Sequence, residues 1–161
     1  TSSRTSSITS FIMTLSFVRT FLLLIFLMGV AGSAVELFLL GHTEEFWQYL
    51  PLVLFGTSLL LLGWHMVSSV PTGLKLFRYA MGLFLIAGPI GLFLHYRENV
   101  AFELEMYPNM GGLELFWEAI TGATPTLAPG TMVLLGLLGW LYTFRHPRFS
   151  KTPNIDPDQK R

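Results

Sequence analysis

The fold of this chain is decided by residues 46–74, which read FWQYLPLVLFGTSLLLLGWHMVSSVPTGL. This stretch contains no Asp, Glu, Lys or Arg. Its central part, residues 50–70, has the length of about 20 apolar residues that a helix needs to cross the hydrocarbon of a bilayer. Backbone groups in lipid must pair within their own segment, which favours a helix over an open strand. We therefore predict a transmembrane helix here.

Three further apolar runs occupy residues 17–40, 76–96 and 127–144. The first begins like a signal peptide, because Arg19 precedes an apolar core. The run continues well past the apolar region of a signal peptide, so we interpret it as a span. The sequence thus predicts an all-α membrane protein, with four transmembrane helices bundled within residues 14–144.

The composition of the 161 residues supports a lipid environment, since 52% are hydrophobic and 12% are charged. The chain contains no cysteine, which excludes disulfides, thiolate metal sites, iron–sulfur clusters and cysteine nucleophiles. It also lacks a phosphate-binding glycine loop and the residue order of a catalytic triad. We therefore expect a non-catalytic role rather than an enzyme, and no nucleic-acid partner.

The basic residues are distributed unevenly between the two sides of the predicted bundle. Nine of the ten lie before the first span, between the second and third, or after the fourth: Arg4, Arg19, Lys75, Arg78, Arg145, Arg148, Lys151, Lys160 and Arg161. The other side holds Arg97 and seven glutamates. The positive-inside rule then places both termini in the cytoplasm, and we expect the cytoplasmic membrane of a bacterium.

Two polar segments lie outside the predicted spans on the basic side. Residues 1–13 are rich in Ser and Thr, which predicts a flexible arm. Residues 145–161 begin with a basic cluster and continue as a polar tail with several prolines. The cluster consists of Arg145, Arg148 and Lys151, which we expect to contact anionic lipid headgroups.

The longest predicted loop, residues 97–126, divides into two parts. Apolar side chains alternate in residues 100–107, which predicts a short strand, although the third span can also continue through them as a helix. The second part, residues 113–120, has the apolar spacing of a short amphipathic helix. Its apolar face is Leu113, Phe116, Trp117 and Ile120, and its acidic residues are Glu114 and Glu118.

This short helix is predicted to be an interaction surface. Its acidic residues argue against attraction to anionic lipid, because helices that seek such membranes carry Lys and Arg on their polar face. Two interpretations remain open. The apolar face can cover the bundle of its own chain, or it can bind a partner protein.

Gly88 and Pro89 lie in the middle of the third predicted span. Pro89 removes a backbone donor and clashes with the preceding turn, which predicts a kink in the helix. Such a kink can serve packing and local bending alone. It can also form a hinge for transport, since broken helices mark some transporter sites.

Ionisable residues near the spans are the candidates for chemistry. Glu36 and His65 are the two that lie inside predicted spans and away from the basic residues at their borders. His42, His95 and Glu36 can together form a site for haem or a transition metal near the outer surface. No metal-ligand spacing supports this site, so the sequence requires no cofactor.

Three functions fit this pattern. We expect first a non-catalytic accessory or scaffolding subunit of a larger membrane complex, whose partners are the lipid bilayer and other membrane protein subunits. The first alternative is a small oligomeric transporter or channel, with Pro89 as hinge and Glu36 as relay. The second alternative is a redox subunit that binds haem or a metal through His42 and His95.

Overall fold

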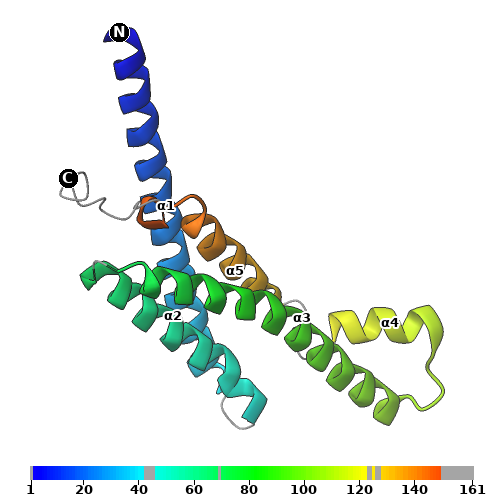
Figure 1. Ribbon diagram of the computed structural model, residues 1–161. Coiled ribbons are helices and arrows are strands. Elements are labelled where there is room, and N and C mark those ends of the chain that lie inside the picture. The colour runs from blue at the N-terminus through cyan, green and yellow to red at the C-terminus, as the bar shows by residue number, and fades with distance from the viewer. Residues whose placement is uncertain (1, 42–45, 69, 123–124, 126–127, 150–161) are drawn as a thin grey trace, which may run out of the picture.

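The computed structural model describes residues 2–41, 46–68, 70–122, 125 and 128–149, with side chains from residue 10 onward (Figure 1). These residues form helices and turns, and no strand occurs among them. The α-helices are α1 (Ser2–Leu39), α2 (Tyr49–Val67), α3 (Thr72–Met106), α4 (Gly112–Thr121) and α5 (Gly130–Thr143). Two short 3₁₀ helices are η1 (Phe46–Gln48) and η2 (Pro147–Phe149).

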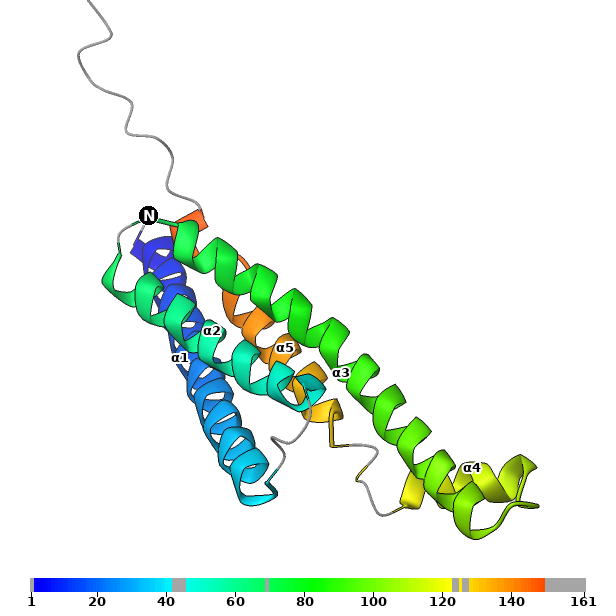
Figure 2. The ribbon, with the colours of Figure 1, turned by 90° about the horizontal axis from the view of Figure 1, so that it is seen from below.

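Helix α3 is the centre of the arrangement, because it packs against α5, α2 and α4, while α1 packs mainly against α5. The starts of α1 and α3 and the ends of α2 and α5 lie at one end of the bundle (Figure 2). We call this the basic end, because it carries Arg19, Lys75, Arg78, Arg145 and Arg148. The opposite, acidic end carries α4 and the described glutamates.

Three helices are long and apolar enough to cross a membrane: Ser10–Leu39, Phe46–Val67 and Thr72–Met106. This finding confirms an all-helical chain with several apolar helices, and it is consistent with an integral membrane protein. Each of these helices covers most or all of one of the first three predicted spans, although the first helix ends one residue before residue 40 and the second ends three residues before residue 70. The apolar side chains that face away from the bundle are extensively exposed, as expected for helices that contact lipid.

Helix α5 is shorter than the fourth predicted span, residues 127–144. Its 14 residues extend about 21 Å, which is less than the roughly 30 Å of a hydrocarbon core. A turn at Ala128 and Pro129 precedes its first residue. At its other end Phe144 is extended and Arg145 has a φ of 46°, which is outside the helical region.

Helices α1 and α3 are longer than the sequence predicted. Helix α1 includes residues 2–13, where we predicted a flexible arm, because no glycine or proline interrupts residues 2–28. The hydroxyls of Thr14 and Thr20 bond to the carbonyl oxygens four residues earlier, which satisfies these polar groups within the helix.

The predicted strand at residues 100–107 is wrong, because α3 continues as a helix to Met106. No glycine or proline breaks residues 92–107, so the helix propagates until Pro108 restricts the residue before it. The alternation of apolar residues is therefore not the signature of a strand here. Helix α3 also runs without interruption through Pro89, and a hinge at Gly88 and Pro89 stays a prediction.

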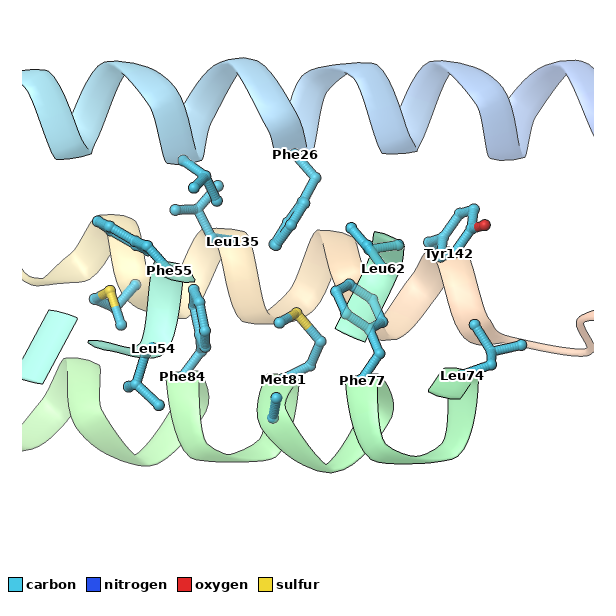
Figure 3. Packing of buried hydrophobic residues seen from close by; sticks show 13 residues of the cluster. Phe26, Leu54, Phe55, Leu62, Leu74, Phe77, Met81, Phe84, Leu135 and Tyr142 are labelled. Carbon is cyan, nitrogen blue, oxygen red and sulfur yellow. The ribbon is translucent and has the colours of Figure 1, made fainter. Parts of the chain in front are cut away.

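Phenylalanine rings from three helices meet in the core of the bundle (Figure 3). Phe26 of α1 is fully buried and reaches α3, where its ring centroid lies 5.5 Å from that of Phe77 and 6.3 Å from that of Phe84. Phe55 of α2 contacts Phe84 at 5.8 Å. Tilted and edge-to-face pairs of this kind are favourable beyond their area of contact. These rings therefore tie α1 and α2 to the central helix.

Glycines bring the backbones of α3 and α5 close together. A Cβ atom at Gly88 would lie 2.5 Å from Val133 Cγ2 and 3.1 Å from the carbonyl oxygen of Pro129. A Cβ atom at Gly136 would lie 3.0 Å from the carbonyl oxygen of Met81. Small residues permit such close approach of helices in membranes. At Gly88 and Gly136 the α3–α5 contact therefore has no room for a side chain.

Candidate functional site

Helix α4 is held against the end of α3 by a buried amide. The Nδ2 atom of Asn99 donates a hydrogen bond to the carbonyl oxygen of Ala119 at 2.9 Å, and both residues are buried. A Cβ atom at Gly122 would lie 2.9 Å from Cγ of Asn99, so glycine is needed for this approach. The ring of Phe116 also contacts that of Tyr96, with 6.0 Å between centroids. These contacts fix how α4 is oriented on α3.

The predicted interaction residues of α4 lie mostly outside this contact. Leu113 is 86% exposed, Trp117 is 64% exposed and Phe116 is 46% exposed. Ile120 is half-buried, whereas Glu114 and Glu118 are exposed. In the structure, α4 therefore contacts its own chain through Ala119 and the ring of Phe116, whereas Leu113 and Trp117 remain exposed. We call the exposed residues Leu113, Phe116 and Trp117 the α4 surface.

A cavity of about 330 Å³ lies toward the acidic end of the bundle, next to the first residues of α5. Residues of α1, η1, α2 and α3 line it, and Pro129 and Thr131 form part of its wall. Helix α5 begins beside Gly88 of α3. The turns of α3 that follow Gly88 toward the acidic end therefore have no part of α5 beside them, and the cavity lies there. Its polar wall residues are Ser33, Gln48, His95, Arg97, Glu98 and Thr131.

Two of the three predicted haem or metal residues, Glu36 and His95, are described, and only His95 lies in the cavity wall. His95 lies in the cavity wall, and its Nδ1 atom is 3.2 Å from the carbonyl oxygen of Pro125, to which it must donate. Glu36 is exposed on α1 and is not part of the cavity wall. His42 lies outside the described residues. Within the described part of the chain, no three His, Asp or Glu side chains are grouped as a metal site would require.

At the basic end, one arginine joins the last turn of α2 to η2. The Nη1 atom of Arg148 donates to the carbonyl oxygens of His65 and Ser68 and lies 3.2 Å from Nδ1 of His65. The two hydrogens of Nη1 serve the two carbonyl oxygens, and the imidazole of His65 lies beside them. Arg19 of α1 donates from Nη2 to the carbonyl oxygen of Arg145 at 2.8 Å. Arg148 thus satisfies carbonyls at the end of α2, and Arg19 binds the backbone just after α5.

His146 completes this cluster between two other rings. Its ring centroid lies 5.2 Å from that of His65 and 5.5 Å from that of Tyr142. Burial, together with the smaller effects of nearby His65, Arg19 and Arg148, lowers the pKa of His146 to about 4. The imidazole of His146 is therefore neutral in the folded protein at neutral pH.

Acid is expected to destabilise the protein through His146. In the unfolded chain this histidine takes up a proton near pH 6.5, whereas the folded protein resists protonation until the pH reaches about 4. Stability is therefore lost as the pH falls from about 6.5 toward about 4. Thermal unfolding in non-ionic detergent should show a falling midpoint over this range and a smaller fall for His146→Gln. An equal fall in both proteins would contradict the assignment.

The three residues predicted to bind lipid headgroups have different environments. Arg148 is engaged by backbone carbonyls within the protein, as described above. Arg145 is exposed, and its guanidinium carbon lies 5.5 Å from the ring centroid of Phe144. Lys151 lies outside the described residues. Of the three, Arg145 is therefore the one whose described side chain is open to a headgroup.

Comparison of the chain with protein-family models, with curated proteins and with solved structures finds no match.

Proposed function

We propose that this protein is a non-catalytic accessory subunit that binds another membrane protein subunit through the α4 surface. The observation that carries this proposal is the combination of a fixed helix and an exposed aromatic face. Asn99 and Ala119 hold α4 in place, while Leu113 and Trp117 stay open. Exposed apolar patches of this kind mark interaction sites, and aromatic residues supply much of the energy of such interfaces.

The position of α4 relative to the bilayer suggests which part of a partner it meets. If the hydrocarbon covers residues 76–96 of α3, Met106 lies ten residues further, about 15 Å along the helix axis. Helix α4 folds back beside this extension, where Ala119 meets Asn99 and Phe116 meets Tyr96, so it lies at the outer border of the hydrocarbon. We propose that the surface of a partner protein covers the exposed ring of Trp117 there.

We further propose that α5 forms a fourth membrane segment packed on α3, with both ends of the chain on the basic side. The close contact of Gly88 and Gly136 with backbone atoms supports this, since it is typical of helix pairs in membranes. The collection of basic residues at one end supports a cytoplasmic location for that end, in the cytoplasmic membrane of a bacterium.

The proposal is tested by purification in mild detergent from membranes of the source organism, combined with site-specific cross-linking. The chain contains no cysteine, so a single introduced thiol reports from one position. Leu113→Cys is expected to cross-link to one defined chain. Glu114→Cys, one residue and about 100° further around the helix, should cross-link much less.

Substitution of the anchor residue provides the second part of the test. Trp117→Ala should weaken retention of the partner by about fivefold to thirtyfold, as for a central interface aromatic. Glu118→Ala is the matched control and should retain the partner. Because Trp117 is mostly exposed, its loss should leave thermal stability unchanged. The proposal is wrong if the protein purifies as a lone monomer, or if Trp117→Ala retains the partner fully.

A further inference from the structure

A pocket at the basic end lies between the first turns of α3 and the last turns of α5. Its volume is about 650 Å³, and its walls are formed by Lys75, Arg78, Tyr79, Gly82, Trp140 and Phe149. The guanidinium carbon of Arg78 lies 5.2 Å from the ring centroid of Trp140, which is a cation–π distance. This contact orients Arg78 along the pocket wall. We call this site the basic pocket.

The two cations of the basic pocket have no carboxylate near them in the described part of the chain. On α3 the acidic residue next in sequence is Glu98, which lies twenty residues beyond Arg78, about 30 Å along the helix. On α1, Phe26 contacts both Phe77 and Phe84 of α3, so it lies at about the level of Arg78 or slightly closer to the acidic end. Glu36 lies ten residues further along α1 toward the acidic end, and so it is far from Arg78. Among the residues that the structure describes, none therefore compensates the positive charge of the pocket, which favours an anionic occupant.

The surroundings of the pocket favour a lipid over a soluble anion. Tyr79 and Trp140 are of the residue types that gather at membrane interfaces, where one part of the ring is apolar and the other polar. Beyond them, Tyr79, Leu83 and Ile86 form an exposed apolar line along α3 with helical spacing. An acyl chain can lie along this line while its headgroup stays between the cations.

We propose that the basic pocket binds the phosphate headgroup of an anionic phospholipid from the leaflet at the basic end. Lys75 and Arg78 supply the two charges, and Arg78 is oriented by Trp140 for hydrogen bonding to phosphate oxygens. This site differs from the predicted one at Arg145, Arg148 and Lys151. It does not depend on the proposed accessory function, because it lies at the opposite end from α4.

The test uses the full chain, delipidated in non-ionic detergent and titrated with phosphatidylglycerol or phosphatidylcholine while bound lipid is counted by native mass spectrometry. Phosphatidylglycerol is expected to bind more tightly than phosphatidylcholine. Arg78→Gln should weaken phosphatidylglycerol binding about fivefold, and the double variant with Lys75→Gln about twentyfold or more, from the usual gain per basic residue at an anionic membrane. Phosphatidylcholine binding should stay unchanged.

Two controls separate the pocket from general surface charge and from loss of folding. Arg145→Gln removes one positive charge at the same end from a side chain that is open to headgroups but lies outside the pocket, so it should weaken phosphatidylglycerol binding less than Arg78→Gln does. Arg78→Lys keeps the charge and should retain most of the preference. Each variant is also melted without added lipid, which shows whether it is folded before its binding is compared.

Three results would overturn the proposal. The first is equal binding of phosphatidylglycerol and phosphatidylcholine by the unaltered protein. The second is a loss in Arg145→Gln as large as that in Arg78→Gln, which would indicate diffuse attraction to the basic end. The third is displacement of phosphatidylglycerol by inorganic phosphate at the same concentration, which would indicate a site for a soluble anion.

Discussion

Replacing Gly88 with alanine is expected to destabilise the protein by about 1–3 kcal/mol, the usual cost of forcing extra atoms into a tightly packed contact. The new methyl group would meet Val133 Cγ2 at 2.5 Å and the backbone of Pro129 and Val133 at 3.1–3.2 Å. Val133 is β-branched and has little freedom to rotate away. The backbone of α5 must therefore move away from α3. Unfolding by a denaturing detergent, followed by circular dichroism, measures the change.

Gly56→Ala is the matched control for this substitution. No atom lies within 4 Å of a Cβ placed at Gly56, so the same methyl group enters open space on α2. Alanine is also the better helix former by about 1 kcal/mol in water, so this variant should be neutral or slightly more stable. Gly88→Ala is thus expected to lower the free energy of unfolding, whereas Gly56→Ala should leave it unchanged or raise it slightly. Equal stability of Gly88→Ala and Gly56→Ala would show that α3 and α5 are not in backbone contact.

Replacing Phe26 with alanine is expected to give the other large effect, by separating α1 from α3. Two ring pairs disappear with Phe26, each worth about 0.5–1.5 kcal/mol, and a cavity is left at a fully buried position. The hydrophobic transfer part of the usual core penalty is reduced, because lipid is as apolar as the core. We therefore expect the loss of the ring pairs to lower the free energy of unfolding by about 1–3 kcal/mol. The cavity left by the ring adds to this loss.

Phe38→Ala on the same helix is the control for Phe26→Ala. Phe38 is 66% exposed, so its truncation removes mainly contact with detergent or lipid. The same detergent titration should show little change for this variant. Phe26→Leu should fall between the two, since leucine fills part of the volume. If Phe38→Ala is as destabilising as Phe26→Ala, the core does not have the composition described for Figure 3.

The apolar helices could be predicted from the sequence because the bilayer imposes a simple requirement of length and apolarity. Residues 50–70 and 76–96 both fall on observed helices, with α2 ending slightly earlier and α3 extending further. The limits of helices outside lipid depend instead on where glycine and proline allow the helix to continue. That is why residues 100–106 are helical despite their alternating pattern.

The contacts at the two ends could not be predicted, because they join residues that are distant in the sequence. Arg148 and His65 are separated by 83 positions, and a basic residue after a span has an equally simple interpretation as a lipid contact. The role of Asn99 in holding α4 was also not predicted. The only indication in the sequence was a single amide side chain between Glu98 and Val100. Its role became visible only when Ala119 and Gly122 were found beside it.

The shortness of α5 also has a consequence for how the protein is made. If α5 is the fourth membrane segment proposed above, its 14 residues are below the length that partitions into a bilayer unaided, so hydrophobicity alone is insufficient for its insertion. Its glycine-lined face matches α3, which is synthesised earlier and supplies the missing contacts. We therefore expect α3 to stay beside the insertion machinery until Thr143 has emerged, so that the two helices enter the membrane as a pair.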